Sequence, residues 1–241
     1  MTWSTVARDP ATGIFGIAVA TRFFAVGALC PFSSKVGTGA TQALVNPTYG
    51  PRSLRLLAEG VPPATVVETL TGLDPGRETR QLHLIDAQGR NAAWTGRDCI
   101  DWAGHLLEPG LSVAGNMLVG PAVVEATLAV FKAKADLPLP LRLLAAMDAG
   151  EAEGGDKRGR QSAALLVQGP EPYPRLSLRV DDHAFPLIEL RRLYNVARER
   201  FIPFSAAFPT DELDPGIFDR AEIERLVAQA ADQISTTERR G

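Results

Sequence analysis

The sequence contains few of the residues that cross-link small secreted proteins or hold metal ions. Cys30 and Cys99 are its two cysteines in 241 residues, too few for a disulfide framework or a cysteine-based zinc site. The histidines His83, His105 and His183 are scattered, without the spacing of metal ligands. We therefore expect two buried, reduced thiols in a cytoplasmic protein that has no metal and no cofactor.

An excess of positive charge and long apolar runs are also missing. The formal net charge is −3, which provides no basic field for nucleic acid. No apolar run approaches the length of a membrane span, and no basic segment followed by an apolar one opens the chain. We expect a small-molecule substrate and further copies of the chain as partners, and neither nucleic acid nor a membrane.

Apolar runs separated by turn-forming residues predict alternating strands and helices. Residues 3–8 and 14–20 flank such a turn and predict a hairpin. Small residues dominate 33–43, and a strand of this composition lets another backbone or a substrate approach closely. Polar and apolar residues alternate over 81–86, which predicts a strand with one half-buried face.

The order of these elements indicates the fold class. Strands, two helices, strands, two helices and strands follow one another along the chain. Paired helices between antiparallel sheet segments predict an α+β fold, a four-layer αββα sandwich of two antiparallel sheets between helix layers. We expect this domain over residues 1–203, followed by a C-terminal loop and helical extension over 204–241.

Thr2 is the first candidate for catalysis because it directly follows Met1. A small second residue usually allows the initiator methionine to be removed, which would give Thr2 a free α-amino group. Thr2 would then carry a hydroxyl nucleophile and a general base together, since an α-amine titrates near about pH 8. The alternative is an ordinary N-terminal dipeptide, with which many proteins begin.

The most polar loop covers residues 151–162 and runs directly into an apolar strand. Its arginines, Arg158 and Arg160, are candidates for binding a substrate carboxylate in bidentate fashion. The alternative is a surface loop with internal ion pairs. The loop lacks the spacing of a phosphate-binding P-loop.

Several motifs together resemble the bacterial and archaeal domain-of-unknown-function family 1028. The matching segments are Thr2-Trp3-Ser4-Thr5-Val6-Ala7-Arg8-Asp9-Pro10, Arg22-Phe23-Phe24-Ala25-Val26-Gly27, Ala40-Thr41-Gln42-Ala43, Asn46-Pro47-Thr48-Tyr49-Gly50, Gly115-Asn116-Met117-Leu118 and the loop from Gly155 to Leu165. The resemblance extends over roughly residues 2–200. It implies the fold of the N-terminal nucleophile (Ntn) hydrolases, which is also similar, more distantly, to that of proteasome β subunits.

The resemblance also implies a catalytic set. Thr2 takes the place of the N-terminal threonine, Lys35 that of the lysine that lowers its proton affinity, and Asn116 that of a serine beside the amine. Asp156 matches the aspartate of the loop before the last core strand and is a candidate for orienting the Thr2 amine. Ala20 stands where the proteases have an aspartate, the usual partner of the lysine.

Alternatives remain for two of these residues. Lys35 is otherwise a solvated surface lysine, and Asn116 a turn residue that tolerates left-handed φ. The backbone N–H groups of Gln42 and Ala43 and the side-chain amide of Asn116 are candidate donors to an oxyanion. The candidate substrate-binding residues are Arg22, Gln42, Asn46, Arg158 and Arg160.

Two functions follow from these observations. The first is an Ntn-type amide hydrolase or acyltransferase that acts on a small amide or peptide-like substrate, with Thr2 as nucleophile after Met1 is removed. The second is a non-catalytic ligand-binding or scaffold protein on the same fold, favoured by Ala20 at the aspartate position.

Overall fold

The computed structural model describes residues 2–238, and Met1, whose removal we predict, lies outside the described residues. The chain divides into two compact units, Met1–Leu190 and Arg191–Gly241. The domain boundary predicted after residue 203 falls within α6 (Phe201–Ser205), inside the second unit. Each unit is described below by itself.

A six-stranded antiparallel sheet forms the centre of the first unit, in the order β10-β9-β2-β1-β8-β7. Its strands are β1 (Thr2–Arg8), β2 (Phe15–Thr21), β7 (Gly104–Glu108), β8 (Leu111–Asn116), β9 (Ser162–Gln168) and β10 (Pro174–Val180). The predicted hairpin is β1 and β2. In the register, Thr2 lies opposite Thr21 of β2 on one side and Asn116 of β8 on the other. Strand β1 thus lies in the interior of the sheet.

The second sheet has four antiparallel strands in sequence order. They are β3 (Pro31–Ser34), β4 (Gly37–Ala43), β5 (Arg80–Asp86) and β6 (Asn91–Thr95). The small-residue segment 33–43 is a hairpin, since the chain reverses between Ser34 and Gly37. At Gly39 a Cβ atom would lie 2.5 Å from the carbonyl oxygen of His83, so β4 brings a second backbone close, as its composition predicts.

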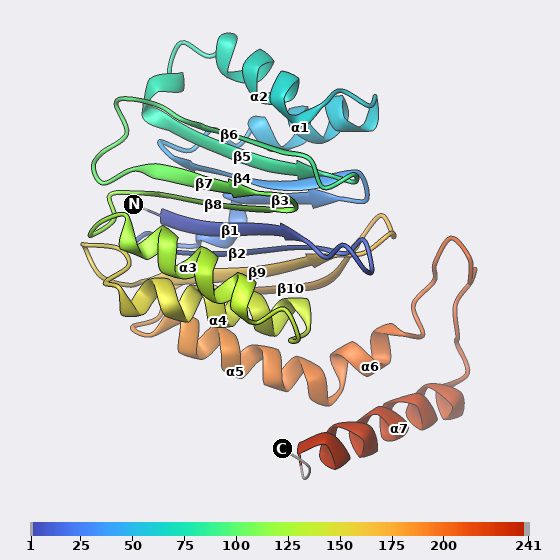
Figure 1. Ribbon diagram of the computed structural model, residues 1–241. Coiled ribbons are helices and arrows are strands. Elements are labelled where there is room, and N and C mark those ends of the chain that lie inside the picture. Colours follow the sequence, from blue (N-terminus) through green and yellow to red (C-terminus); the bar gives the residue numbers. More distant parts are fainter. Residues whose placement is uncertain (1, 239–241) are drawn as a thin grey trace. The chain divides into compact units, whose positions relative to one another are not determined.

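Helices cover the outer face of each sheet (Figure 1). The four-stranded sheet contacts α1 (Tyr49–Ala58) and α2 (Pro63–Gly72), and the six-stranded sheet contacts α3 (Ala122–Ala133) and α4 (Leu139–Ala152). The inner faces of the two sheets contact one another through β1, β2 and β8 on one side and β4 and β5 on the other. A mixed α+β fold with two antiparallel sheets is therefore confirmed.

Helix α5 (Pro186–Glu199) begins in the first unit, and α6 and α7 (Arg220–Glu238) belong to the second. Helix α7 covers most of the helix predicted near the C-terminus. Among residues 2–238, no helix combines the length and the apolar character that crossing a membrane requires.

Apolar side chains of α4 pack against the six-stranded sheet. Leu143 and Leu144 are fully buried, and each stabilises the fold by roughly 1.5–3 kcal/mol relative to an exposed leucine. The Cδ1 atom of Leu143 occupies the space that a Cβ at Gly16 would take, at 2.5 Å. Gly16 therefore allows α4 to lie directly on β2.

Candidate functional site

Thr2 stands at the start of β1 with its side chain largely enclosed. It is 8% exposed, and its Oγ1 donates a hydrogen bond to Oγ1 of Thr21 at 3.2 Å. Because Thr21 is the last residue of β2 and Asn116 the last of β8, three strand ends meet here. Thr2 is thus held between neighbours on both sides, at an edge where loops leave the sheet.

Three buried carboxamides fix the backbone of Thr2. Its carbonyl oxygen accepts hydrogen bonds from Nδ2 of Asn116 and Nε2 of Gln42, each at 3.4 Å. The same two groups donate to Oε1 of Gln81, at 2.9 and 3.0 Å. The Nε2 group of Gln81 donates in turn to the carbonyl of Gly115 at 2.7 Å. Asn116 therefore uses its amide hydrogens on Thr2 and Gln81 and positions Thr2, so the side-chain oxyanion donor expected from the sequence is committed elsewhere.

Gln81 is a residue that sequence reasoning missed. The alternation over 81–86 predicted a strand with one half-buried face, whereas Gln81 and His83 are 0% exposed because the polar side of β5 faces the other sheet. The predicted layering contained the signal, since a strand between helices and a second sheet is buried on both faces.

His83 forms the next part of this buried layer. Its Nε2 lies 2.8 Å from Oγ of Ser4, and its Nδ1 lies 2.8 Å from Oγ of Ser112. Ser4 donates its own hydroxyl hydrogen to Oε1 of Gln42 at 2.7 Å, so Nε2 must donate to Ser4 and Nδ1 must accept from Ser112. Burial, aided by the charge of His105, lowers the pKa of His83 to about 3. His83 is therefore a neutral structural group and not a general base.

Two cavities lie beside the Thr2 strand end. The Leu29 cavity, of about 230 Å³, is lined by Thr2 together with apolar side chains that include Phe24, Val26 and Leu29. The Asp98 cavity, of about 320 Å³, is lined by Thr79, Asp98, Cys99, Ile100, Asn116 and Met117. Ala43 and Leu44 line both cavities and form the wall that they share.

Unusual backbone conformations are concentrated at these cavities. Among the described residues, three that are not glycine have positive φ: Ala25 at 54°, Ala43 at 67° and Met117 at 53°. Ala25 lines the Leu29 cavity, Met117 lines the Asp98 cavity, and Ala43 lines both. Side chains rarely adopt this region, and such strain clusters at functional sites. The residues with positive φ thus lie in the same part of the structure as Thr2.

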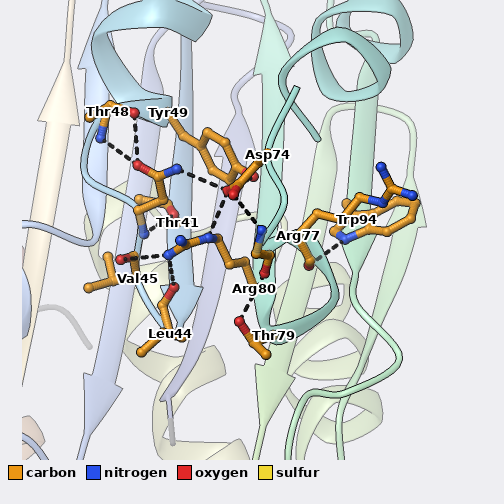
Figure 2. Close-up of polar contacts among 12 residues, drawn as sticks. Thr41, Leu44, Val45, Thr48, Tyr49, Asp74, Arg77, Thr79, Arg80 and Trp94 are labelled. Carbon is orange, nitrogen blue, oxygen red and sulfur yellow. Dashed lines mark hydrogen bonds and ion pairs between the residues drawn. The ribbon is translucent and has the colours of Figure 1, made fainter. Parts of the chain in front are cut away.

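The shared wall is anchored by a polar network around Asp74 (Figure 2). Oδ2 of Asp74 accepts hydrogen bonds from the Tyr49 hydroxyl at 2.6 Å and from Nδ2 of Asn46 at 3.1 Å, and lies 2.7 Å from Nε of Arg80. Nη1 of Arg80 donates to the carbonyl of Leu44 at 2.7 Å. Burial opposes ionisation of Asp74, but these hydrogen bonds and the Arg80 charge outweigh it and lower the pKa of Asp74.

Asn46 has a local role in this network. Besides its bond to Asp74, its Oδ1 accepts hydrogen bonds from the backbone N–H and the hydroxyl of Thr48, at 3.1 and 2.8 Å. Its carboxamide therefore holds the segment that follows Leu44, and Asn46 borders the site as a loop anchor.

The Asp156 loop packs against the end of β2. Oδ2 of Asp156 accepts from the backbone N–H of Arg22 at 2.7 Å, and Oδ1 accepts from the backbone N–H of Arg158 at 2.8 Å. Nη1 of Arg22 donates to the carbonyl of Arg158 at 2.8 Å. Asp156 is buried, and the Arg22 backbone that it holds lies one residue beyond Thr21, the partner of Thr2, so Asp156 supports the strand end from the side of β2.

Internal ion pairs occupy both arginines of this loop. Nη2 of Arg158 lies 3.2 Å from Asp156 Oδ2, and Nε of Arg160 lies 3.0 Å from Glu151 Oε1. Neither arginine lines the Leu29 or the Asp98 cavity. The structure thus favours the surface-loop alternative for Arg158 and Arg160 over a carboxylate clamp at Thr2.

Lys35 requires a correction, because the structure does not bring it to Thr2. It lies exposed in the turn between β3 and β4. Gln42, which contacts the Thr2 carbonyl, lies near the opposite end of β4, and at about 3.3 Å per residue the strand separates them by roughly 20 Å. The resemblance implied the role, but the chain reverses at this residue and turns it away from Thr2.

This geometry defines a class of protein: a mixed α+β fold with two sheets, in which a threonine stands at a strand end beside two cavities. The chain belongs to the family of unknown function DUF1028, whose sequence model matches residues 2–190. It is 34% identical to a protein of this family from Silicibacter pomeroyi, whose crystal structure superimposes with a TM-score of 0.84 over 91% of this chain and 96% of that one.

Other comparisons add little. Anbu, an ancestral β-subunit from Yersinia bercovieri, is 13% identical, with a TM-score of 0.37 over 86% of this chain and 98% of that one, and we base no argument on that likeness. A search of curated proteins finds no match. Within residues 2–238, no group of three or more His, Cys, Asp or Glu side chains is arranged to hold a metal ion.

Proposed function

We propose that this protein is an amide hydrolase or acyltransferase with an Ntn-type αββα fold, in which Thr2 is the nucleophile once Met1 has been removed. The observation that carries the proposal is the position of Thr2, at the start of a central strand and in the wall of a cavity. A small amide or peptide-like molecule is the proposed substrate. A cytoplasmic location and a homo-oligomeric state are part of the same proposal.

The proposed reaction begins with attack of Thr2 Oγ1 on the carbonyl carbon of the substrate amide. The α-amine of Thr2 takes the hydroxyl proton and later delivers it to the departing amine. An acyl ester on Oγ1 remains, and water or another acceptor takes the acyl group. Gln42 and Asn116 hold the Thr2 carbonyl, which keeps the amine and the hydroxyl in one orientation.

Lys35 has no part in this scheme. Without a nearby lysine, the amine must be neutral through its own titration, so activity should rise with pH through about 8. Asp156 contributes by holding the backbone of Arg22, next to the residue that receives the Thr2 hydroxyl hydrogen.

The deciding test combines intact mass with turnover. We expect the protein purified from a bacterial cytoplasm to lack one methionine, and to hydrolyse at least one member of a panel of small amides. Thr2→Ala should abolish that turnover, and Thr2→Ser should retain part of it. Turnover that survives Thr2→Ala would contradict the proposal.

The second candidate is a ligand-binding protein without catalysis. The specific observation in its favour is the exposed position of Lys35 together with Ala20 at the position of its usual partner. Retention of Met1, together with ligand binding that is equal in wild type and Thr2→Ala and no turnover, would support this candidate. Thr2-dependent turnover would exclude it.

A further inference from the structure

The two cavities open beside the same strand end. Thr2 lines the Leu29 cavity and Asn116 lines the Asp98 cavity, and these two residues lie directly opposite one another in the register of β1 and β8. Leu44 lines both cavities and divides them. A molecule with two arms could therefore place one in each cavity and its centre at Thr2.

The cavities differ in their chemistry. Apolar groups dominate the wall of the Leu29 cavity, and the rim residues Phe24 and Leu29 are exposed. In the Asp98 cavity, Ile100 and Met117 provide apolar surface and Asp98 the only charge among the lining residues. Among the described residues that line either cavity, none is lysine or arginine.

Among the described residues, Asp98 is paired only at long range, with an exposed arginine. Nε of Arg97 lies 3.8 Å from the Asp98 carboxylate and 3.9 Å from that of Glu78, and Glu78 also pairs with Nε of Arg77 at 3.2 Å. Arg97 itself is exposed, and Lys157 donates to the backbone carbonyl of Asp101. An anionic ligand group would be repelled by the Asp98 carboxylate in the cavity wall, whereas an ammonium or guanidinium group would pair with it.

The thiol of Cys99, in the wall of the Asp98 cavity, lies near the same negative charges. Burial raises the pKa of Cys99 to about 11, and the negative charges of Asp98 and Glu78 act in the same direction. Cys99 is thus a neutral, weakly polar part of the wall, and it leaves Asp98 as the group that selects the charge of a ligand.

We propose that this site takes an amide with two unlike arms, an apolar arm in the Leu29 cavity and an arm that ends in a cation at Asp98. The inference rests on the proposed function for the position of the amide at Thr2. It replaces the carboxylate-bearing substrate that Arg158 and Arg160 suggested from the sequence, because neither arginine reaches the cavities.

A matched pair of probes tests the charge preference. The phenylpropanoyl amide of putrescine ends in an ammonium group, and the phenylpropanoyl amide of γ-aminobutyrate ends in a carboxylate on a chain of similar length. Calorimetric titration of the full-length protein should show the ammonium probe binding roughly two- to fivefold more tightly, as a partly exposed pair allows. Equal binding, tighter binding of the carboxylate probe, or no binding of either probe would overturn the proposal.

Two variants test whether Asp98 causes the preference for the ammonium probe. Asp98→Asn should remove most of the difference between the probes, while Asp136→Asn, at an exposed position between α3 and α4, should leave it unchanged. A preference that survives Asp98→Asn would contradict the assignment.

The apolar arm has its own matched pair. Leu29→Glu should weaken both probes more than tenfold. Leu107→Glu should not, because Leu107 is partly exposed and pairs with Ser112 toward the other end of β8 from Asn116. Circular dichroism confirms that both variants are folded, and unchanged binding in folded Leu29→Glu would refute this part.

The same experiment separates this inference from the proposed function. Binding is measured without turnover, so a preference for the ammonium probe with no hydrolysis of any amide would leave the two-armed site standing and remove the catalytic role of Thr2. Hydrolysis that depends on Thr2 but favours the carboxylate probe would support the catalytic role of Thr2 and remove the cation preference at Asp98.

Discussion

His83 illustrates how the neighbours of a single buried side chain set its chemistry. A histidine in an alternating strand is ordinarily a solvent-facing group, but here both ring nitrogens are bonded to serine hydroxyls between the sheets. The desolvation that this position imposes keeps the ring neutral. Its effect is therefore expected in stability and not in catalysis.

The low pKa of His83 predicts a loss of stability in acid. The unfolded chain binds a proton near pH 6.5 and the folded chain only near 3, so the free energy of unfolding falls by about 1.4 kcal/mol per pH unit between these values. From pH 7 to pH 5 this amounts to about 2 kcal/mol in urea titrations. His83→Gln should remove this component, whereas exposed His183→Gln should keep it. An unchanged slope in His83→Gln would contradict the assignment.

Among the polar residues near Thr2, Gln81 is the one whose substitution should lower the free energy of unfolding most. Gln81→Leu leaves the amides of Gln42 and Asn116 and the carbonyl of Gly115 without their partner, which should lower the free energy of unfolding by about 3 kcal/mol. The matched control is Gln88→Leu in the exposed turn after β5, where a change within about 0.5 kcal/mol is expected. Chemical denaturation measures both, and equal effects would argue against the network.

Elements meet closely where small residues line them, and β4 is the main example. Gly39→Ala would place a Cβ atom 2.5 Å from both the His83 carbonyl and the Phe32 ring, so we expect a loss of about 2 kcal/mol or more in the free energy of unfolding. At Gly72, the last residue of α2, no atom lies within 4 Å of the added Cβ. Gly72→Ala should be neutral or stabilising by up to about 1 kcal/mol. Thermal unfolding of the pair decides the point.

The Asp74 network holds the segment between β4 and α1, which divides the two cavities. Asp74→Ala removes a largely buried partner from Arg80 and should cost about 3 kcal/mol of unfolding free energy. Because the pKa of Asp74 is lowered, its contribution is present above the pKa of the unfolded chain and is lost as the pH falls through that of the folded state.

Hydrogen exchange provides a local check on this element. The backbone N–H of Leu44 donates to the carbonyl of Thr79, and Asp74→Ala should speed its exchange. The exposed residue Asp136 provides the control, since Asp136→Ala should leave exchange at Leu44 unchanged. Equal exchange in both variants would show that the network does not anchor the wall.

For the whole molecule, the predicted domain boundary can be tested directly. Within the described residues 2–238, the ten strands and both cavities lie in residues 2–190. A chain that ends at residue 203 should therefore retain a cooperative unfolding transition within a few degrees of the full protein. Calorimetry of the two chains is the measurement. Loss of cooperative unfolding in the shorter chain would show that residues 204–241 are required for the fold. Sedimentation of both chains tests the homo-oligomer.

Short-range signals in the sequence are sufficient to predict the local elements and the family. The hairpin of β1 and β2, the helix pairs and the mixed α+β class follow from periodicity and from Gly and Pro at their ends, because these signals act over a few residues. Strand β7 was missed, although Pro109-Gly110 marks the turn that follows it. Thr2 is proposed as the nucleophile from evidence of equally short range, its place directly after Met1.

Which distant residues meet depends on the tertiary structure. It brought Gln42 and Asn116 to the carbonyl of Thr2, and it brought Gln81, which carries no motif, to the amides of both. It turned Lys35 away from Thr2 and placed Asp156 on the backbone of Arg22, 134 residues earlier in the chain. The physical reason is that pairing register and chain reversals set these distances, and a single turn between β3 and β4 moves a side chain by the length of a strand.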